Sequence, residues 1–372
     1  MFADITPILD SNLRYAHVEQ AGFATDADAL TWRNRFGVQS QQGQFSGLIE
    51  FENVTALVQD YNSGLNGKTA YPTEPDPQVT ELNRAQVTWT PDSHSSLTIG
   101  RQRLILDDAR FVGNVGWRQD EQTFDAVRYD LKNGKFALTA AYLTKINRVL
   151  GEEKDWDSDS YLLNASYLLH GVKLTAFDYA LDFSNAAASS TLTLGARATG
   201  GFNLANVKVN LTGQYAHQSD YRNNPADFDL QESMLEVAAS YKITSFKINY
   251  ESLGGDGKVG FVTPLGTVHA FEGFADAFSG TGGNKTTVNG LDDLNYAATL
   301  NLPHKSALTL IYHDLSTARL GVGLGHEWDA VATIALTKHI SLLAKYADFD
   351  ASASPLAPAS RRKTWLALSY KL

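Results

Sequence analysis

The stretch Trp365-Leu366-Ala367-Leu368-Ser369-Tyr370-Lys371-Leu372 ends the chain and is its most informative part. Polarity alternates along it, so the leucines and the tyrosine share one face of a strand, and the tryptophan and the lysine share the other. A chain that stops on such a strand, with an apolar face ending in Tyr-x-Leu, is typical of the last strand of a bacterial outer-membrane β-barrel. A soluble β-sandwich can also end on an alternating strand, so the rest of the chain must decide between the two classes.

The same alternation recurs along nearly the whole chain. Trp32 and Phe36 fall opposite Arg33 and Arg35, for example, so charged residues occupy the middle of the polar face. Counting the weaker segments gives about 18 strands of roughly ten residues, the length that a tilted strand needs to cross a bilayer. A soluble sandwich would show more β-branched, core-like segments than this chain does. The pattern therefore predicts a transmembrane antiparallel up-and-down β-barrel.

Short and long connections alternate between these segments. The tight turns contain sequences such as Gln41-Gln42-Gly43 and Lys132-Asn133-Gly134. The longer, acidic connections lie near residues 55–78, 107–121, 146–158, 217–230, 253–293 and 350–360. Short periplasmic turns and long extracellular loops are the outer-membrane pattern, and an even strand number is expected when both termini are periplasmic. No linker interrupts the rhythm, so we expect one barrel domain over residues 1–372.

Composition agrees with an exported membrane protein. The chain contains no cysteine, and its 43% of hydrophobic residues form no run of about 18 that could make a membrane helix. Met1-Phe2-Ala3-Asp4 lacks the basic and apolar regions of a signal peptide, so we interpret the chain as a mature protein whose export signal has been removed. The net charge of -10 argues against a nucleic-acid partner.

Charged residues on the polar faces and in one loop are the candidate pore lining. Basic residues outnumber acidic ones on these faces, which points to an anion-preferring or saccharide-carrying pore with its excess acid in the loops. Neighbouring Arg and Glu residues can instead pair across strands and simply fill the barrel. The candidates are Arg14, Arg33, Arg35, Glu50, Glu52, Arg84, Arg101, Arg103, Arg110, Arg118, Arg128, Lys145 and Arg197.

Two long connections have unusual compositions. Residues 107–118 combine Arg, Asp and aromatic residues, and residues 260–278 contain four phenylalanines, which are costly in an exposed loop unless they pack together. Either connection could fold into the pore as a constriction or plug, although the first could equally be an ordinary exposed loop. The candidate constriction residues are Trp117, Phe261, His269, Phe271, Phe274 and Phe278.

These two blocks, "GRQRL…DDARFVGNVGWRQDEQTFDAVRY" and "FVTPLGTVHAFEGFADAF", resemble the alginate export family of outer-membrane barrels. The resemblance runs from Arg14-Tyr15 to the terminal strand. It implies an 18-stranded monomeric barrel with an Arg-rich lumen that passes an anionic polysaccharide. Because this chain is shorter than an alginate exporter with large loops, a small anion, sugar or aromatic acid is also an expected cargo. Arg101, Arg103, Arg110, Arg118 and Arg128 are the matched basic positions.

Catalytic and metal motifs are absent from the sequence. There is no H-E-x-x-H or G-x-S-x-G, and His94 beside Ser93 and Ser95 fits a turn better than a catalytic site. We therefore expect no enzyme activity, no catalytic residue, no metal and no cofactor.

The sequence thus predicts a passive outer-membrane porin for anionic or saccharide-like small solutes. Its expected partners are membrane lipid, lipopolysaccharide and the solute. A plugged structural or adhesion barrel, or a barrel that sheathes a partner protein, are the alternatives.

Overall fold

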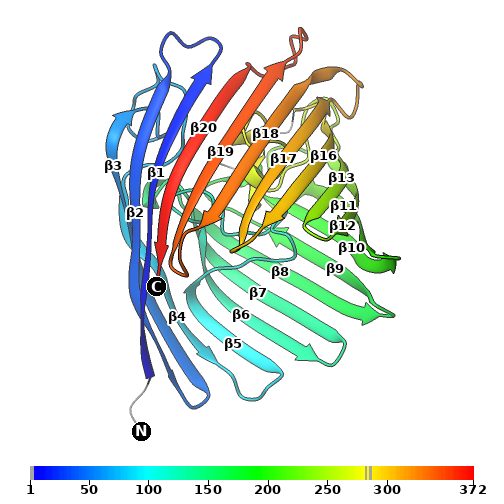
Figure 1. The fold of residues 1–372 in the computed structure, drawn as a ribbon. Coiled ribbons are helices and arrows are strands. Elements are labelled where there is room, and N and C mark those ends of the chain that lie inside the picture. The colour runs from blue at the N-terminus through cyan, green and yellow to red at the C-terminus, as the bar shows by residue number, and fades with distance from the viewer. Residues whose placement is uncertain (1–3, 281–282, 285–286) are drawn as a thin grey trace.

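Eighteen long strands make up the molecule (Figure 1). The computed structural model describes residues 4–280, 283–284 and 287–372, so the start of the chain at Met1-Phe2-Ala3 lies outside the described residues. The strands are β1 (Asp4–Gln20), β2 (Ala27–Gln42), β3 (Phe45–Asp60), β4 (Val79–Trp89), β5 (Ser95–Gln102), β6 (Thr123–Asn133), β7 (Phe136–Asn147), β8 (Trp156–Leu169), β9 (Val172–Leu181), β10 (Thr191–Leu204), β11 (Val207–Asp220), β12 (Asp229–Tyr241), β13 (Thr244–Leu253), β16 (Leu291–Leu302), β17 (Ser306–Ser316), β18 (Gly323–Ala335), β19 (Ile340–Ala351) and β20 (Arg361–Lys371).

Small elements interrupt three of the connections. A two-stranded ribbon, β14 (Ser279–Gly280) and β15 (Gly283–Asn284), and the 3-10 turns η1 (Glu152–Lys154), η2 (Ala187–Ser189) and η3 (Val268–Ala270) lie outside the main sheet. No helix in the described ranges has the length and apolarity needed to cross a membrane.

The sheet closes on itself. Each strand pairs antiparallel with its neighbour along the chain, and β13 pairs with β16 across the longest connection. The terminal strand β20 pairs with β1, with Leu13 opposite Leu368. Because every strand then has two neighbours, no sheet edge remains to expose unpaired backbone groups, which a bilayer would not tolerate. The prediction of an 18-stranded antiparallel barrel is confirmed.

Polarity is reversed relative to a soluble protein. On β20, Leu366 and Leu368 are 54% and 45% exposed on the outer wall, whereas Trp365 is fully buried on the inner side. Conversely, the charged residues Glu50 and Glu52 are 1% and 0% exposed. An apolar outer wall is stable only against hydrocarbon, so the alternation sorts lipid-facing from lumen-facing side chains.

The connections follow the predicted alternation with two corrections. β3 runs to Asp60, so the loop expected near 55–78 begins at residue 61. The sequence pattern also did not reveal the loops at 21–26, 182–190 and 317–322 and the turns at 205–206 and 336–339. Several of these segments are short and rich in alanine or glycine, so they carry too few turn-specific residues to stand out from the alternation. The first described residue, Asp4, and the C-terminus lie at the end of the barrel that bears the short turns (Figure 1).

Candidate functional site: the loops inside the barrel

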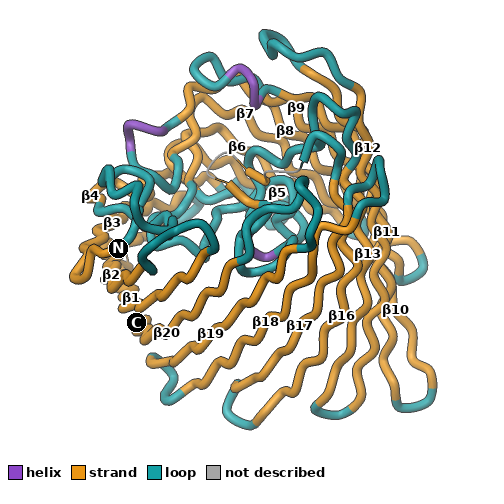
Figure 2. The backbone as a smooth tube through the Cα atoms, turned by 90° about the horizontal axis from the view of Figure 1, so that it is seen from above, coloured by secondary structure: helices purple, strands orange, loops and turns teal. Residues whose placement is uncertain are grey.

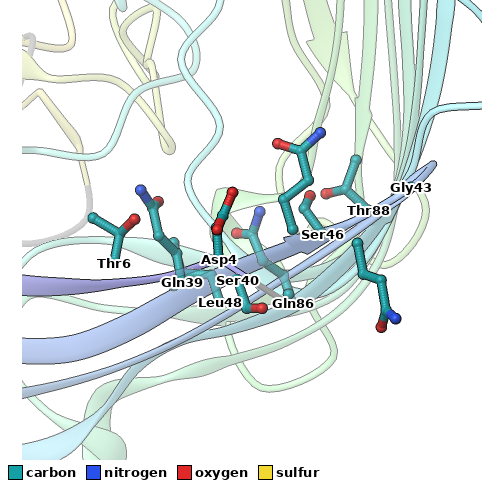
Figure 3. A pocket seen from close by; sticks show the side chains of 12 residues that line it. Asp4, Thr6, Gln39, Ser40, Gly43, Ser46, Leu48, Gln86 and Thr88 are labelled. Carbon is teal, nitrogen blue, oxygen red and sulfur yellow. The ribbon is translucent and has the colours of Figure 1, made fainter. Parts of the chain in front are cut away.

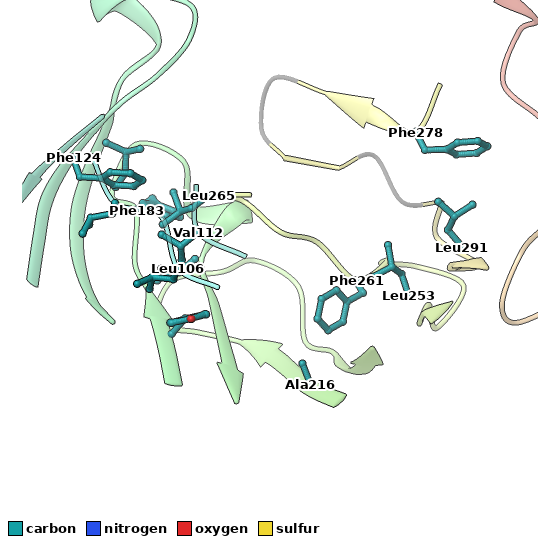
Figure 4. Close-up of a cluster of buried hydrophobic side chains, with 14 of the residues drawn as sticks. Leu106, Val112, Phe124, Phe183, Ala216, Leu253, Phe261, Leu265, Phe278 and Leu291 are labelled. Carbon is teal, nitrogen blue, oxygen red and sulfur yellow. The ribbon is translucent and has the colours of Figure 1, made fainter. Parts of the chain in front are cut away.

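Two long connections from opposite parts of the chain fill the upper part of the barrel. Residues 103–122 join β5 to β6, and residues 254–290, called here the aromatic loop, join β13 to β16. Seen from above, loops lie within the ring of strands (Figure 2). Val112 and Leu265, one from each connection, are both fully buried and form a parallel bridge (Figure 4).

Backbone hydrogen bonds join the two connections. The Gly113 N–H donates to the Leu265 carbonyl, and the Thr267 N–H donates to the Ala109 carbonyl, each at 2.9 Å. The side-chain amide of Gln122 donates to that same Leu265 carbonyl at 3.1 Å. These bonds satisfy backbone groups that would otherwise be buried without a partner, so the two connections behave as one folded unit.

The predicted aromatic residues all take part in this unit. Phe261 packs edge-on against Phe111 with 6.2 Å between ring centres, and Phe278 packs edge-on against Phe349 of β19 at 5.7 Å. The Arg110 guanidinium lies over the Phe271 ring at 4.8 Å. The phenylalanines therefore avoid water by packing inside the barrel, which is the packed arrangement that the sequence required of them.

Trp117 is the point where both connections meet the barrel wall. Its ring stacks on His269 with 4.5 Å between centres, and Trp365 of β20 packs against it edge-on at 5.4 Å. Two cations lie near the Trp117 ring: the Arg14 guanidinium at 4.7 Å and the Lys345 ammonium at 4.0 Å. A desolvated cation over a tryptophan face is a stabilising contact, so this cluster ties β1, β19 and β20 to the two connections.

Lys345 also joins the aromatic loop directly. Its ammonium lies 2.7 Å from Nε2 of His269, and Nδ1 of His269 lies 2.7 Å from a carboxylate oxygen of Asp276. Burial lowers the pKa of His269 well below its usual value, so the ring is neutral and can accept a hydrogen bond from Lys345. Lys345 further lies 3.2 Å from the centre of the Phe274 ring.

Every predicted basic residue of the lumen and loops forms an ion pair. The partners are Asp76 for Arg14, Asp10 for Arg33, Glu52 for Arg35, Glu50 for Arg84, Asp125 for Arg101, Glu121 for Arg103, Glu251 and Glu272 for Arg110, Glu74 and Asp276 for Arg118, Asp130 for Arg128, Asp155 for Lys145, and Asp108 for Arg197. Pairing of this kind reduces the field that these residues present to a solute.

Carboxylates on the inner wall of β12–β18 were not recognised from the sequence. Glu232, Glu251, Asp293, Glu327 and Asp329 are all buried, so the barrel wall carries acidic residues that were not counted when most of the excess acid was expected in the loops. Glu327 accepts the Ala275 N–H at 2.6 Å, and Asp329 accepts the Phe274 N–H at 3.1 Å. These two carboxylates therefore fasten the tip of the aromatic loop to β18.

A cavity of about 380 Å³ lies beside the cluster of Trp117, His269 and Lys345, and His269 is part of its lining. It is called here the basic vestibule, because its charged lining residues are Arg118, Arg148, Arg361, Lys363 and Asp276. Burial raises the pKa of Asp276, but Arg118, His269 and Lys363 outweigh burial and hold that pKa well below its usual range. Burial lowers the pKa of Arg148 to about 10, so its guanidinium remains charged at neutral pH. Four cations thus face one carboxylate.

Arg361 differs from Arg118 and Lys363 in its partners. Arg118 and Lys363 share the carboxylates of Glu74 and Asp276. Arg361 instead donates to the backbone carbonyls of Asp276 at 3.1 Å and Ala359 at 3.4 Å, and no ion pair involves it in the described part of the chain. The next residue, Arg362, is exposed and pairs with Glu19 at 3.2 Å and Asp348 at 3.4 Å.

Sequence analysis missed Arg361, although a signal was present. Arg361, Lys363 and Trp365 are separated by two residues each, so they share the inner face of the terminal strand. Within the described residues, no group of three or more His, Asp or Glu side chains is placed to hold a metal ion.

Comparison with known proteins gives a family and a fold. The sequence profile of the alginate export family matches residues 12–234. The structure of OccAB2 from Acinetobacter baumannii superposes with a TM-score of 0.75 at 15% identity, over 99% of this chain and 98% of that one. The outer-membrane protein OpdK from Pseudomonas aeruginosa superposes with a TM-score of 0.72 at 15% identity, over 99% and 98%. No curated protein sequence matches this chain.

Proposed function

This chain belongs to the alginate export family and lies in the bacterial outer membrane, and on that premise we propose that it is a passive channel for small organic anions. A solute enters from the extracellular side, where the basic vestibule attracts its carboxylate, and then passes the layer formed by Trp117, His269 and Lys345. The observation that carries this proposal is Arg361, which lines the vestibule and forms no ion pair in the described part of the chain.

Two cargo classes fit this vestibule. An acidic oligosaccharide fits the family, and a small aromatic acid fits a related fold, because OpdK has been solved with vanillate. The cavity of about 380 Å³ has room for one small acid or one to two sugar-acid rings at a time. We expect no nucleic-acid partner, because the chain carries a net charge of -10.

A planar bilayer measurement tests the channel. Under a KCl gradient the wild-type protein should show a reversal potential of the sign that indicates anion preference, and vanillate or an oligouronate should block the current. Arg361→Gln should lower the anion-to-cation permeability ratio on the order of threefold, the effect of one charge at about 15 Å through a medium of intermediate polarity. Arg362→Gln is the matched control, because that neighbouring arginine faces outward and is paired.

Two outcomes would contradict the proposal. Cation preference in the wild-type protein would refute an anion channel. A loss of anion preference of equal size in both arginine variants would show that the vestibule is not the selective element.

A plugged barrel is the second candidate, and the packing of the aromatic loop favours it. Phe261 and Phe278 are 0% and 1% exposed, as are core residues of a soluble protein. Deletion of residues 260–278 distinguishes the two functions. A silent wild-type protein that conducts after the deletion is plugged, whereas a conducting wild-type protein is a channel, narrowed by this loop if the deletion raises its conductance.

A further inference from the structure

The other end of the barrel contains a second cavity with a different chemistry. It has a volume of about 680 Å³ and is lined by the inner faces of β1–β4, close to the turn at Gly43. Figure 3 shows Thr6, Gln39, Ser46 and Gln86 with their side chains standing on this wall. The cavity is called here the amide cavity.

Register places its side chains in two rows across four strands. Thr6 lies opposite Gln39, Gln39 opposite Leu48, and Leu48 opposite Gln86. In the next row, Asp4 lies opposite Gln41, Gln41 opposite Ser46, and Ser46 opposite Thr88. Neighbouring strands are about 5 Å apart, so polar groups recur at about that spacing along each row.

Thr88 of the amide cavity is hydrogen-bonded to Thr98 at 2.9 Å, but four other polar side chains of its lining are accessible and have no protein partner in the described part of the chain. The side chains of Gln39, Gln86, Ser46 and Thr6 form no hydrogen bond with another described residue. An amide carries both donors and an acceptor, and a hydroxyl carries a donor and acceptor lone pairs. This wall can therefore match a ligand whose own groups both donate and accept, which is the property of a sugar hydroxyl.

Charge separates this cavity from the vestibule. Among the described residues that line it, only Asp4 is charged. Moving inward along β3 and β4, the first ion pair is Glu50–Arg84, with 2.8 Å between Arg84 Nη2 and Glu50 Oε2. A wall without cations gives a carboxylate no special attraction, whereas neutral amides bind hydroxyl groups weakly and release them readily, as a conducting path requires.

We propose that the amide cavity is a binding station for uncharged saccharides, which it holds through their hydroxyl groups at the short-turn end of the barrel. The station goes beyond the anion channel proposed above and does not depend on it, because none of its residues lines the vestibule. Successive rings of an oligosaccharide are spaced by about the distance between neighbouring strands, so a short chain of two or three rings can lie along one row.

Cysteine protection tests the station without requiring an open pore. The natural chain has no cysteine, so Ser46→Cys introduces a single thiol into the cavity wall. Its rate of modification by a water-soluble thiol reagent should fall at least severalfold when maltotriose is added at millimolar concentration. Ser93→Cys is the matched control, because Ser93 is exposed in a short turn and does not line the cavity.

Removal of the amides tests the chemistry of the contact. In the Ser46→Cys background, Gln39→Leu with Gln86→Leu keeps the side-chain bulk but removes the donors and acceptors, so protection should disappear. Gln231→Leu should leave protection unchanged, because Gln231 is an exposed residue of β12 that does not line the cavity. Saturation-transfer NMR with maltotriose should show the same loss in the double variant.

Defined outcomes overturn the proposal. The proposal is wrong if the rate of thiol modification in Ser46→Cys is the same with and without maltotriose. It is also wrong if maltotriose protects Ser93→Cys equally, or if protection remains in the double leucine variant. The reversal potential in KCl is read separately, so cation preference in the wild-type protein would refute the channel proposal and leave the station standing. An anion-selective channel without maltotriose protection would do the reverse.

Discussion

The vestibule end and the short-turn end of this barrel treat polar groups in opposite ways. At the vestibule end, charged side chains of the loops are buried and form ion pairs, as Arg110 does with Glu251 at 2.7 Å and Glu272 at 2.6 Å, although Arg361 forms none in the described part of the chain. At the short-turn end, neutral side chains such as Gln39 and Gln86 remain without protein partners. A buried charge needs a partner because desolvation is costly, whereas an amide in a wet cavity does not. Ion pairs therefore hold the loops inside the barrel, whereas the neutral side chains at the other end line an open cavity.

Removing a buried charge should cause the largest effect. Arg110→Leu leaves the carboxylates of Glu251 and Glu272 buried without their cation, which should destabilise the fold by about 3–5 kcal/mol. Arg128→Leu is the control, because its pair with Asp130 is partly exposed and should contribute about 0–1 kcal/mol. Denaturant unfolding in detergent measures both. Equal losses would mean that burial does not set the strength of these pairs.

Acidity should act on the aromatic loop through Glu272. Burial raises the pKa of Glu272 to about 7, although Arg110 opposes that rise. The docked loop therefore holds this proton more tightly than the released loop, whose pKa is ordinary. The contribution of Glu272 to docking should be largest below about pH 4.3, where the carboxyl group is protonated in both states. As the pH rises to 7, this contribution should fall by up to about 3 kcal/mol, and above pH 7 it should change little.

Limited proteolysis of the loop between pH 5 and pH 8 measures this dependence. Cleavage should accelerate with pH in the wild-type protein and be flat in Glu272→Gln. Asp276 contributes in the opposite direction only at lower pH, because its pKa lies well below the usual range. Unchanged pH dependence in Glu272→Gln would assign the effect to another group.

A smaller effect is expected where the loop tip meets β18. Gly273 has a φ of +87°, and an added Cβ would lie 2.4 Å from a carboxylate oxygen of Glu327. Gly22 has a similar φ of +93° with nothing within 4 Å, so it shares the backbone strain without the clash. Gly273→Ala should loosen the aromatic loop by about 1–3 kcal/mol more than Gly22→Ala costs its own loop. Hydrogen exchange of residues 270–279 measures the difference, and equal losses would place the whole cost in the backbone.

The predictions from sequence succeeded where the signal was local. Leu366 and Leu368 repeat at period two, and this periodicity identifies the lipid-facing side of a strand without any knowledge of its neighbours. The prediction of lumen residues was incomplete for Glu327 and Asp329, which lie buried on the inner face of β18 but were not counted among them. The arginines were located, and pairing between neighbouring strands was anticipated, as Arg35 and Glu52 show. Long-range partners were not found, because residues such as Arg110 and Glu272 are 162 residues apart.

The sequence by itself determined the barrel, an approximate strand number, the two sides of its wall and the presence of alternating short and long connections. Each of these follows from the period of a strand and the need to pair every backbone group in lipid. Only the tertiary structure decided which charged side chains form ion pairs and where neutral polar groups line an open cavity. Those properties depend on distances between residues far apart in the chain, and closure of the barrel alone brings such residues together.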